Sequence, residues 1–118
     1  MPTVVFWKSR PEVPLKPAAV YQELQFGEDV AGLIDLPVKD FLTEIKTAFP
    51  NHHETPGALV AFGATGKFEL SWTWQFVAAK MQDLVSVDVE RLKEIFVTHG
   101  CGVYEVELDQ WSPPNAAY

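Results

Sequence analysis

The sequence predicts an α+β protein with an antiparallel sheet, arranged on a ferredoxin-like split βαβ plan. The first observation is the order of the segments, in which strand-like and helix-like stretches follow one another as β, α, α, β, β, α, β. The second is the length of 118 residues without a linker or internal repeat, which fits one unit. We expect an additional helix in the first crossover and all helices on one face of the sheet. Residues 1–111 should form the domain and residues 112–118, which contain a Pro-Pro pair, a flexible tail.

The first half of the chain is predicted to hold one strand and two helices. Residues 3–7, TVVFW, are β-branched and aromatic, as in a buried strand. A helix is predicted to begin with Pro17 and to end at Gly27. A second is predicted over residues 38–49, where apolar side chains recur at helical spacing until Pro50. Residues 51–56 are predicted to be a loop.

The middle of the chain is predicted to form extended structure. Residues 58–62 are an apolar strand candidate, and the glycines in residues 63–66 favour a turn that opens a hairpin. From residue 68 to residue 78 apolar and polar side chains alternate without an internal Gly or Pro. This pattern indicates one extended strand, or two strands joined by a bulge near the tryptophans.

The last third is predicted to be a helix followed by a strand. Ser86 has the residue type of a helix N-cap, and Gly100 is a typical helix end. Residues 101–108 are apolar enough to close the domain as a final strand.

The charge of the chain narrows the classes of partner. Nine basic and 16 acidic residues give a net charge of −7, which disfavours nucleic acid and anionic membrane surfaces. No apolar stretch reaches the roughly 18 residues of a membrane span. The single cysteine, Cys101, excludes an intrachain disulfide, so nothing requires an oxidising compartment. We therefore expect a cytoplasmic protein without a cofactor.

Two clusters contain residue types that metal binding or catalysis uses. Neighbouring His52 and His53, followed by Glu54, point in different directions in an extended segment and cannot chelate one ion as two histidines on a helix face can. His99 near Cys101 has the composition of a nucleophile pair. A histidine at a helix end and a cysteine entering a buried strand also have ordinary structural roles. We predict no catalytic residue and no metal ligand.

The alternation from residue 68 predicts two different sheet faces. If Phe68, Trp72, Trp74 and Phe76 face the helices, the intervening polar side chains face outward. The last strand adds two glutamates to that outward face if Tyr104, Val106 and Leu108 point inward. The resulting acidic, hydrogen-bonding surface comprises Glu69, Ser71, Thr73, Gln75, Glu105 and Glu107. The alternative is a polar face that contacts only solvent.

Short motifs along the chain also carry a resemblance. They are Phe6-Trp7, the helix from Phe41 to Pro50, the segment 68–75, and Gly100-Cys101-Gly102-Val103-Tyr104. With these the chain resembles a group of small, uncharacterised bacterial proteins that end in a helix and a strand of the form G-C-x-x-Y-D-x-Q. The residues after the tyrosine, Glu105-Val106-Glu107, depart from that form. The resemblance implies a compact α+β domain. It favours binding, because proteins of this size and type often act as immunity-like or accessory partners.

Three functions are compatible with these observations. The leading hypothesis is a non-catalytic, immunity-like or regulatory module whose acidic sheet face binds a basic protein. The alternative is a small-molecule binder or enzyme, as a monomer or a homodimer, with an aromatic-lined cavity near Trp72, Trp74 and Tyr104. The third is self-assembly through an exposed edge strand.

Overall fold

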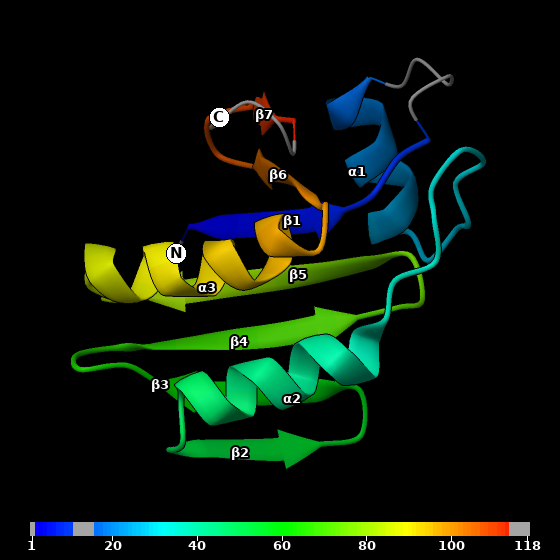
Figure 1. Cartoon of the computed structure of the whole chain (residues 1–118). Coiled ribbons are helices and arrows are strands. Elements are labelled where there is room, and N and C mark those ends of the chain that lie inside the picture. Colours follow the sequence, from blue (N-terminus) through cyan, green and yellow to red (C-terminus); the bar gives the residue numbers. More distant parts are fainter. Residues whose placement is uncertain (1, 11–15, 114–118) are drawn as a thin grey trace.

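The computed structural model describes residues 2–10 and 16–113 and confirms an α+β fold with an antiparallel sheet (Figure 1). Over these residues the chain forms seven strands in the order β2-β3-β4-β5-β1-β6-β7, and every neighbouring pair is antiparallel. The elements along the chain are β1 (Thr3–Trp7), α1 (Pro17–Gln25), α2 (Val38–Ala48), β2 (His52–Thr55), β3 (Ala58–Phe62), β4 (Lys67–Trp72), β5 (Phe76–Gln82), α3 (Ser86–Thr98), β6 (Gly102–Glu105) and β7 (Gln110–Ser112).

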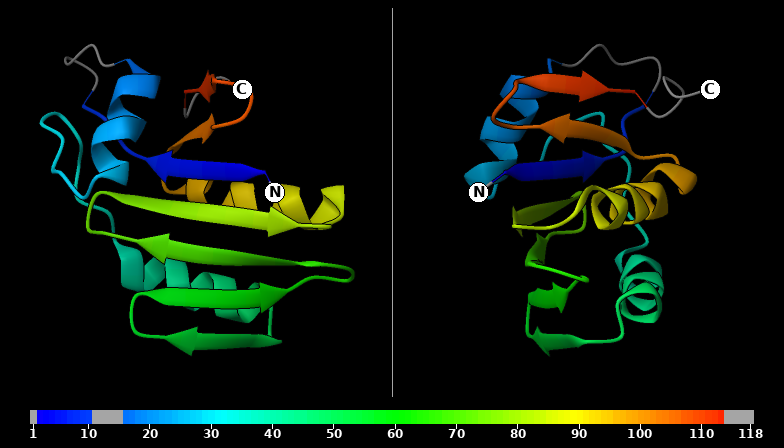
Figure 2. Two further views of the ribbon diagram at one scale, coloured as in Figure 1. Left: turned by 180° about the vertical axis from the view of Figure 1, so that it is seen from behind. Right: turned by 90° about the vertical axis from the view of Figure 1, so that its left-hand side faces the viewer.

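Helices α2 and α3 pack side by side on one face of the sheet and cover the main hydrophobic cluster (Figures 1 and 2). The ring of Phe6 in β1 stacks on Phe96 of α3, with ring centroids 4.0 Å apart. Phe49, directly after α2, meets Phe68 of β4 edge to face at 4.9 Å. The apolar stripes of both helices are thus anchored on the sheet by aromatic pairs.

Helix α1 packs on the opposite face, so the prediction that all helices share one face is wrong. Val20 and Leu24 of α1 belong to a second cluster that includes Val5 and Trp7 of β1. Trp111 of β7 stacks on Trp7 at 4.7 Å. The physical reason is visible in β1, where all residues from Val4 to Trp7 are buried. A strand that is apolar on both faces needs cover on both faces.

The alternating segment from residue 68 is a hairpin, and the prediction of one long or bulged strand is wrong. Trp74 and Gln75 form a two-residue turn between β4 and β5, closed by a hydrogen bond in which the Thr73 N–H donates to the Phe76 carbonyl (3.0 Å). Such a turn reverses which positions face the helices. Leu70 is buried before it, and Val77 is buried after it.

Residues 52–55, predicted as loop, form the edge strand β2. This strand has the sequence HHET, and three of its four residues are exposed, so no apolar alternation identifies it. Its extended conformation is set by pairing with β3 and is not signalled by its own sequence pattern.

The end of the domain also differs from the prediction. Val85, and not Ser86, occupies the N-cap position of α3, and no side chain caps that end. The single closing strand is divided, because the chain turns after β6 at Asp109, where φ is +49°, and returns as β7. Ser112 pairs with Val103 in this ribbon, while the remainder of the predicted tail, from residue 114, lies outside the described residues.

Within the described ranges, no helix has the length and apolar character needed to span a bilayer.

Candidate functional site

The predicted acidic face is only partly assembled. Glu69 and Ser71 of β4 are exposed on the face opposite α2 and α3. Glu69 lies directly across from Lys80 of β5. Lys67 comes two residues before Glu69 and therefore lies on the same side of β4. This part of the sheet therefore presents alternating charges and no acidic surface.

Two further residues of that predicted face lie in the β4–β5 turn. Thr73 is exposed, and its Oγ1 accepts a hydrogen bond from the Gln75 N–H at 3.2 Å. Gln75 is buried, in contrast to the prediction. Its Oε1 accepts from the Val30 N–H (2.8 Å) and its Nε2 donates to the Val30 carbonyl (3.0 Å). The side chain of Gln75 thus fastens the loop before α2 to the turn.

The two glutamates at the end of the chain do not join Glu69. Glu105 points to the helix-covered face, where the Lys93 Nζ donates to its Oε1 at 2.9 Å. Glu107 accepts a hydrogen bond from the Thr3 N–H at 2.7 Å. The prediction that they share a face with Glu69 fails because Tyr104 points toward α1 instead of the main cluster.

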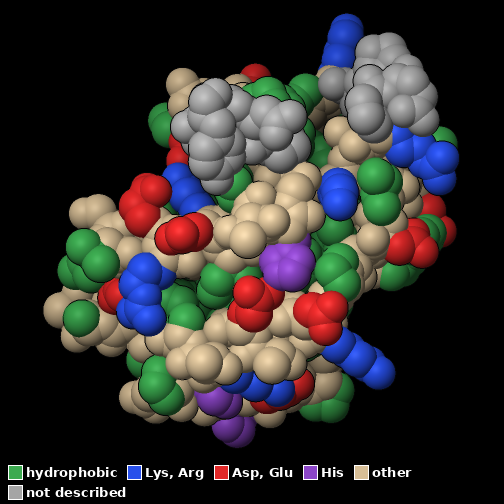
Figure 3. Space-filling model, in the orientation of Figure 1, with side chains coloured by type: hydrophobic (Ala, Val, Ile, Leu, Met, Phe, Trp, Pro, Cys, Tyr) green, Lys and Arg blue, Asp and Glu red, His purple; other side chains and the backbone are tan. Residues whose placement is uncertain are grey.

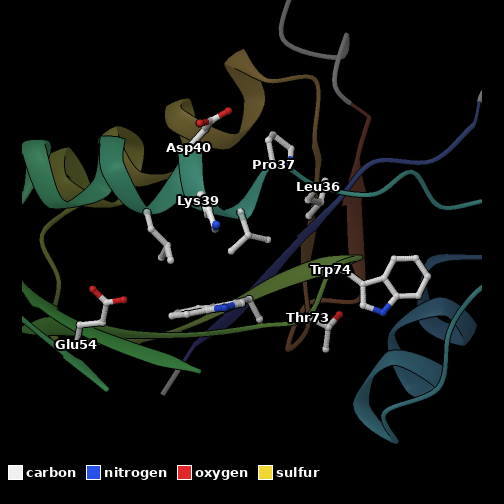
Figure 4. A pocket seen from close by; sticks show the side chains of 10 residues that line it. Leu36, Pro37, Lys39, Asp40, Glu54, Thr73 and Trp74 are labelled. Atoms are coloured by element: carbon white, nitrogen blue, oxygen red, sulfur yellow. The ribbon is translucent and has the colours of Figure 1, made fainter. Parts of the chain in front are cut away.

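The tryptophans of the alternative hypothesis do line one groove, of about 670 Å³, between the start of α2 and the end of β4 (Figure 4). Trp72 is half-buried against the main cluster, and Trp74 is 49% exposed. In Figure 4, Glu54 and Trp74 lie at opposite ends of this groove. The lining, which is mostly apolar, consists of Leu36, Pro37, Val38, Lys39, Asp40, Leu42, Glu54, Trp72, Thr73 and Trp74.

Tyr104 does not belong to this groove. It packs in the second cluster, 5.7 Å from Trp7 and 5.8 Å from Tyr21 between ring centroids. Its hydroxyl donates to Asp109 Oδ1 at 2.6 Å. The expectation that Tyr104 shares a cavity with the two tryptophans is therefore wrong.

The backbone around the groove is held in place from several sides. The Leu36 N–H donates to the Trp74 carbonyl at 2.8 Å, joining the loop before α2 to the turn. The Gln75 contacts with Val30 act on the same two segments. A surface whose backbone is fixed in this way loses little conformational entropy when it binds.

Three charged side chains, those of Lys39, Asp40 and Glu54, line the groove together with its apolar residues. Lys39 and Asp40 are exposed on the first turn of α2, and Glu54 forms an ion pair with Lys46. Figure 3 shows carboxylates distributed with lysines and arginines over the helix-bearing side of the molecule. The net charge of −7 therefore acts as a diffuse field around an apolar groove.

The histidines and the cysteine have local packing contacts. His52 Nδ1 lies 2.9 Å from the Phe49 carbonyl, and His99 pairs with Glu44 across α2 and α3. Burial raises the pKa of Cys101 to about 12, opposed by the positive charge of Lys8. Among residues 2–10 and 16–113, three or more His, Cys, Asp or Glu side chains do not gather into a group that could hold a metal ion.

Sequence reasoning missed the helix side of the groove and one buried carboxylate. Val38 and Leu42 have the spacing of core residues, and nothing in that spacing separates a groove wall from a core. Asp88 is 5% exposed, and its Oδ2 accepts from the Ala64 N–H at 2.9 Å. It joins α3 to the β3–β4 turn, a contact across 24 positions that sequence periodicity does not signal.

Neither the models of known protein families nor the curated proteins include one that matches this chain. The resemblance to small uncharacterised bacterial proteins therefore stays a prediction.

Proposed function

We propose that this protein is a non-catalytic binding module that takes an apolar segment of a basic partner protein into the groove beside Trp72 and Trp74. The observation that carries the proposal is the half-exposed Trp74 on a turn with a fixed backbone. The Leu36 N–H donates to the Trp74 carbonyl, and the Gln75 side chain is hydrogen-bonded to the backbone of Val30. A large aromatic side chain on a rigid backbone is the usual anchor of a protein interface. The acidic charge of the whole molecule supports a basic partner, whose approach it would accelerate.

A peptide library displayed on phage tests this function with the purified protein as bait. We expect selected peptides to combine aliphatic residues with Lys or Arg, and their affinity to fall at high salt. Trp74→Ala should weaken binding about tenfold or more, since interface anchors typically contribute over 1 kcal/mol. Phe26→Ala is the matched control, because Phe26 is also an exposed aromatic, at 79%, and does not line the groove. Equal binding by the Trp74→Ala variant would contradict the proposal.

A small-molecule ligand is the second candidate function. It is supported by the volume of the groove, about 670 Å³, which lies within the range of about 300–1,000 Å³ that such sites occupy. Quenching or a spectral shift of tryptophan emission by an aromatic or aliphatic metabolite, smaller in Trp74→Phe because only Trp72 then remains in the groove, would favour this function over the first.

We further propose that the sheet is an elaborated form of the ferredoxin-like plan. Strands β1 and β4 run parallel with β5 between them, and β5 and β6 run parallel with β1 between them, as in two interleaved split βαβ units. Strands β2, β3 and β7 would then be additions at the two edges. We also propose a cytoplasmic location without a membrane or nucleic-acid partner, supported by the single cysteine and the acidic charge.

A further inference from the structure

Strand β2 forms one edge of the sheet, and no described element lies beyond it (Figure 1). His53, Glu54 and Thr55 are exposed, and His52 is half-buried. The outward N–H and C=O groups of such an edge are ready to pair with another strand.

The hydrogen bonds to β3 define which residues of β2 point their backbone groups outward. The Phe62 N–H donates to the Asn51 carbonyl at 3.0 Å, so residue 51 belongs to a hydrogen-bonded pair. These pairs alternate along an antiparallel ladder, and the register then places His53 opposite Val60 in the next one. The intervening residues, His52 and Glu54, therefore direct their N–H and C=O groups away from the sheet.

Prolines limit this edge to those two residues. Continuing the same outward row in either direction leads to Pro50 and Pro56, which have no N–H group to donate. A partner strand that satisfies the edge must therefore be as short as β2 itself.

A second copy of β2 meets this requirement when the two strands pair antiparallel about His53. His52 then lies opposite Glu54 of the other copy, and the reverse pair is identical, which gives four backbone hydrogen bonds. The pairing also sets an imidazole against a carboxylate. Shifting it by one step to centre on Glu54 would oppose two carboxylates and bring Pro56 into the ladder, so charge and donors select the same register.

We propose that the protein forms a homodimer through β2, with His53 at the twofold axis and the two sheets joined edge to edge. The inference does not rest on the groove function, because the Trp74→Ala variant leaves β2 unchanged. The contact is short, so the dimer is of the weak class that forms at high protein concentration.

Engineered cysteines test the register directly. His53→Cys places two thiols at a non-hydrogen-bonded pair with Cα atoms about 4.5 Å apart, within the range of about 4.4–6.8 Å that a disulfide spans. Thr55→Cys is the matched control on the same strand and face, because its copy lies four residues along the ladder, about 14 Å away. Cys101 is buried and does not compete. Under mild oxidation we expect a covalent dimer from His53→Cys and at least about tenfold slower cross-linking of Thr55→Cys.

Sedimentation of the wild-type protein over a range of concentrations supplies a second measurement. The mass should rise from 13.2 kDa toward twice that value. Glu54→Pro removes an outward N–H without touching the bonds to β3, and it should weaken the dimer at least about tenfold, whereas Glu54→Gln, which keeps the N–H, should weaken it less. Equal cross-linking of both cysteine variants, or a monomer at all concentrations, would overturn the proposal, the latter leaving the edge to a strand of another protein.

Discussion

At the scale of single residues, burial makes the thiol of Cys101 unreactive. It is fully buried among the main cluster, and burial raises its pKa to about 12, so the neutral thiol persists through the ordinary pH range. Because the thiolate is the nucleophile, we expect iodoacetamide at pH ~8 to label the folded protein at least about 100-fold more slowly than the unfolded protein. Mass spectrometry in buffer and in urea measures both rates. Equal rates would show that the thiol is accessible in the folded state.

Tyr104 makes the stability of the fold depend on pH in the alkaline range. The hydrogen bond to Asp109, followed by burial, raises its pKa to about 12 from 10.0. A raised pKa means that the folded state holds the proton more tightly than the unfolded state. This contribution to stability is complete below pH ~10 and is lost as pH rises toward ~12. The ultraviolet absorbance of tyrosinate should titrate at lower pH in Asp109→Asn, and Tyr104→Phe should lack this titration step.

The position of Tyr104 also shows what single residues in a sequence cannot reveal. Its apolar neighbours correctly predicted burial, but both faces of β1 and β6 are covered, so burial did not identify the face. That uncertainty then carried over to Glu105, which follows Tyr104 and necessarily points the opposite way.

At the scale of elements, the β4–β5 turn depends on one amide. Gln75→Ala removes both hydrogen bonds to Val30 and leaves the buried Val30 N–H unpaired, while the Val30 carbonyl keeps only the 3.4 Å hydrogen bond from the Leu33 N–H. We expect a loss of about 1–3 kcal/mol in the free energy of unfolding in urea and faster hydrogen exchange at Val30. Gln82→Ala, at an exposed position of β5, is the control and should change stability by less than about 0.5 kcal/mol. Unchanged exchange at Val30 would contradict the assigned role.

The same turn explains why the hairpin was not predicted. Neither Trp74 nor Gln75 is a residue type that two-residue turns favour, so turn chemistry gave no signal. The signal that did exist is the change of the buried positions from even to odd at Val77. Helix α2 and strand β3 were predicted correctly because their apolar patterns are regular and end at Pro50 and the glycines after Phe62.

At the scale of the whole molecule, β1 connects the two hydrophobic clusters. Phe6 faces the cluster under α2 and α3, and its neighbour Trp7 faces the cluster under α1. We expect Phe6→Ala and Trp7→Ala each to lower the free energy of unfolding by about 3–5 kcal/mol. Because both clusters share this strand, the two clusters should unfold in one transition. Tryptophan fluorescence and far-ultraviolet circular dichroism should then change together. Two separate transitions would show that the clusters are independent.

The central place of β1 governs how the chain folds as it is synthesised. Its partners, β5 and β6, begin at Phe76 and Gly102, so β1 is synthesised well before the strands with which it pairs. Until then the apolar run from Val4 to Trp7 has no sheet to enter, and pairing it requires closing a loop of most of the chain. A nascent chain that ends before β5 therefore leaves this apolar run without its partner strands, and unpaired apolar strands favour aggregation.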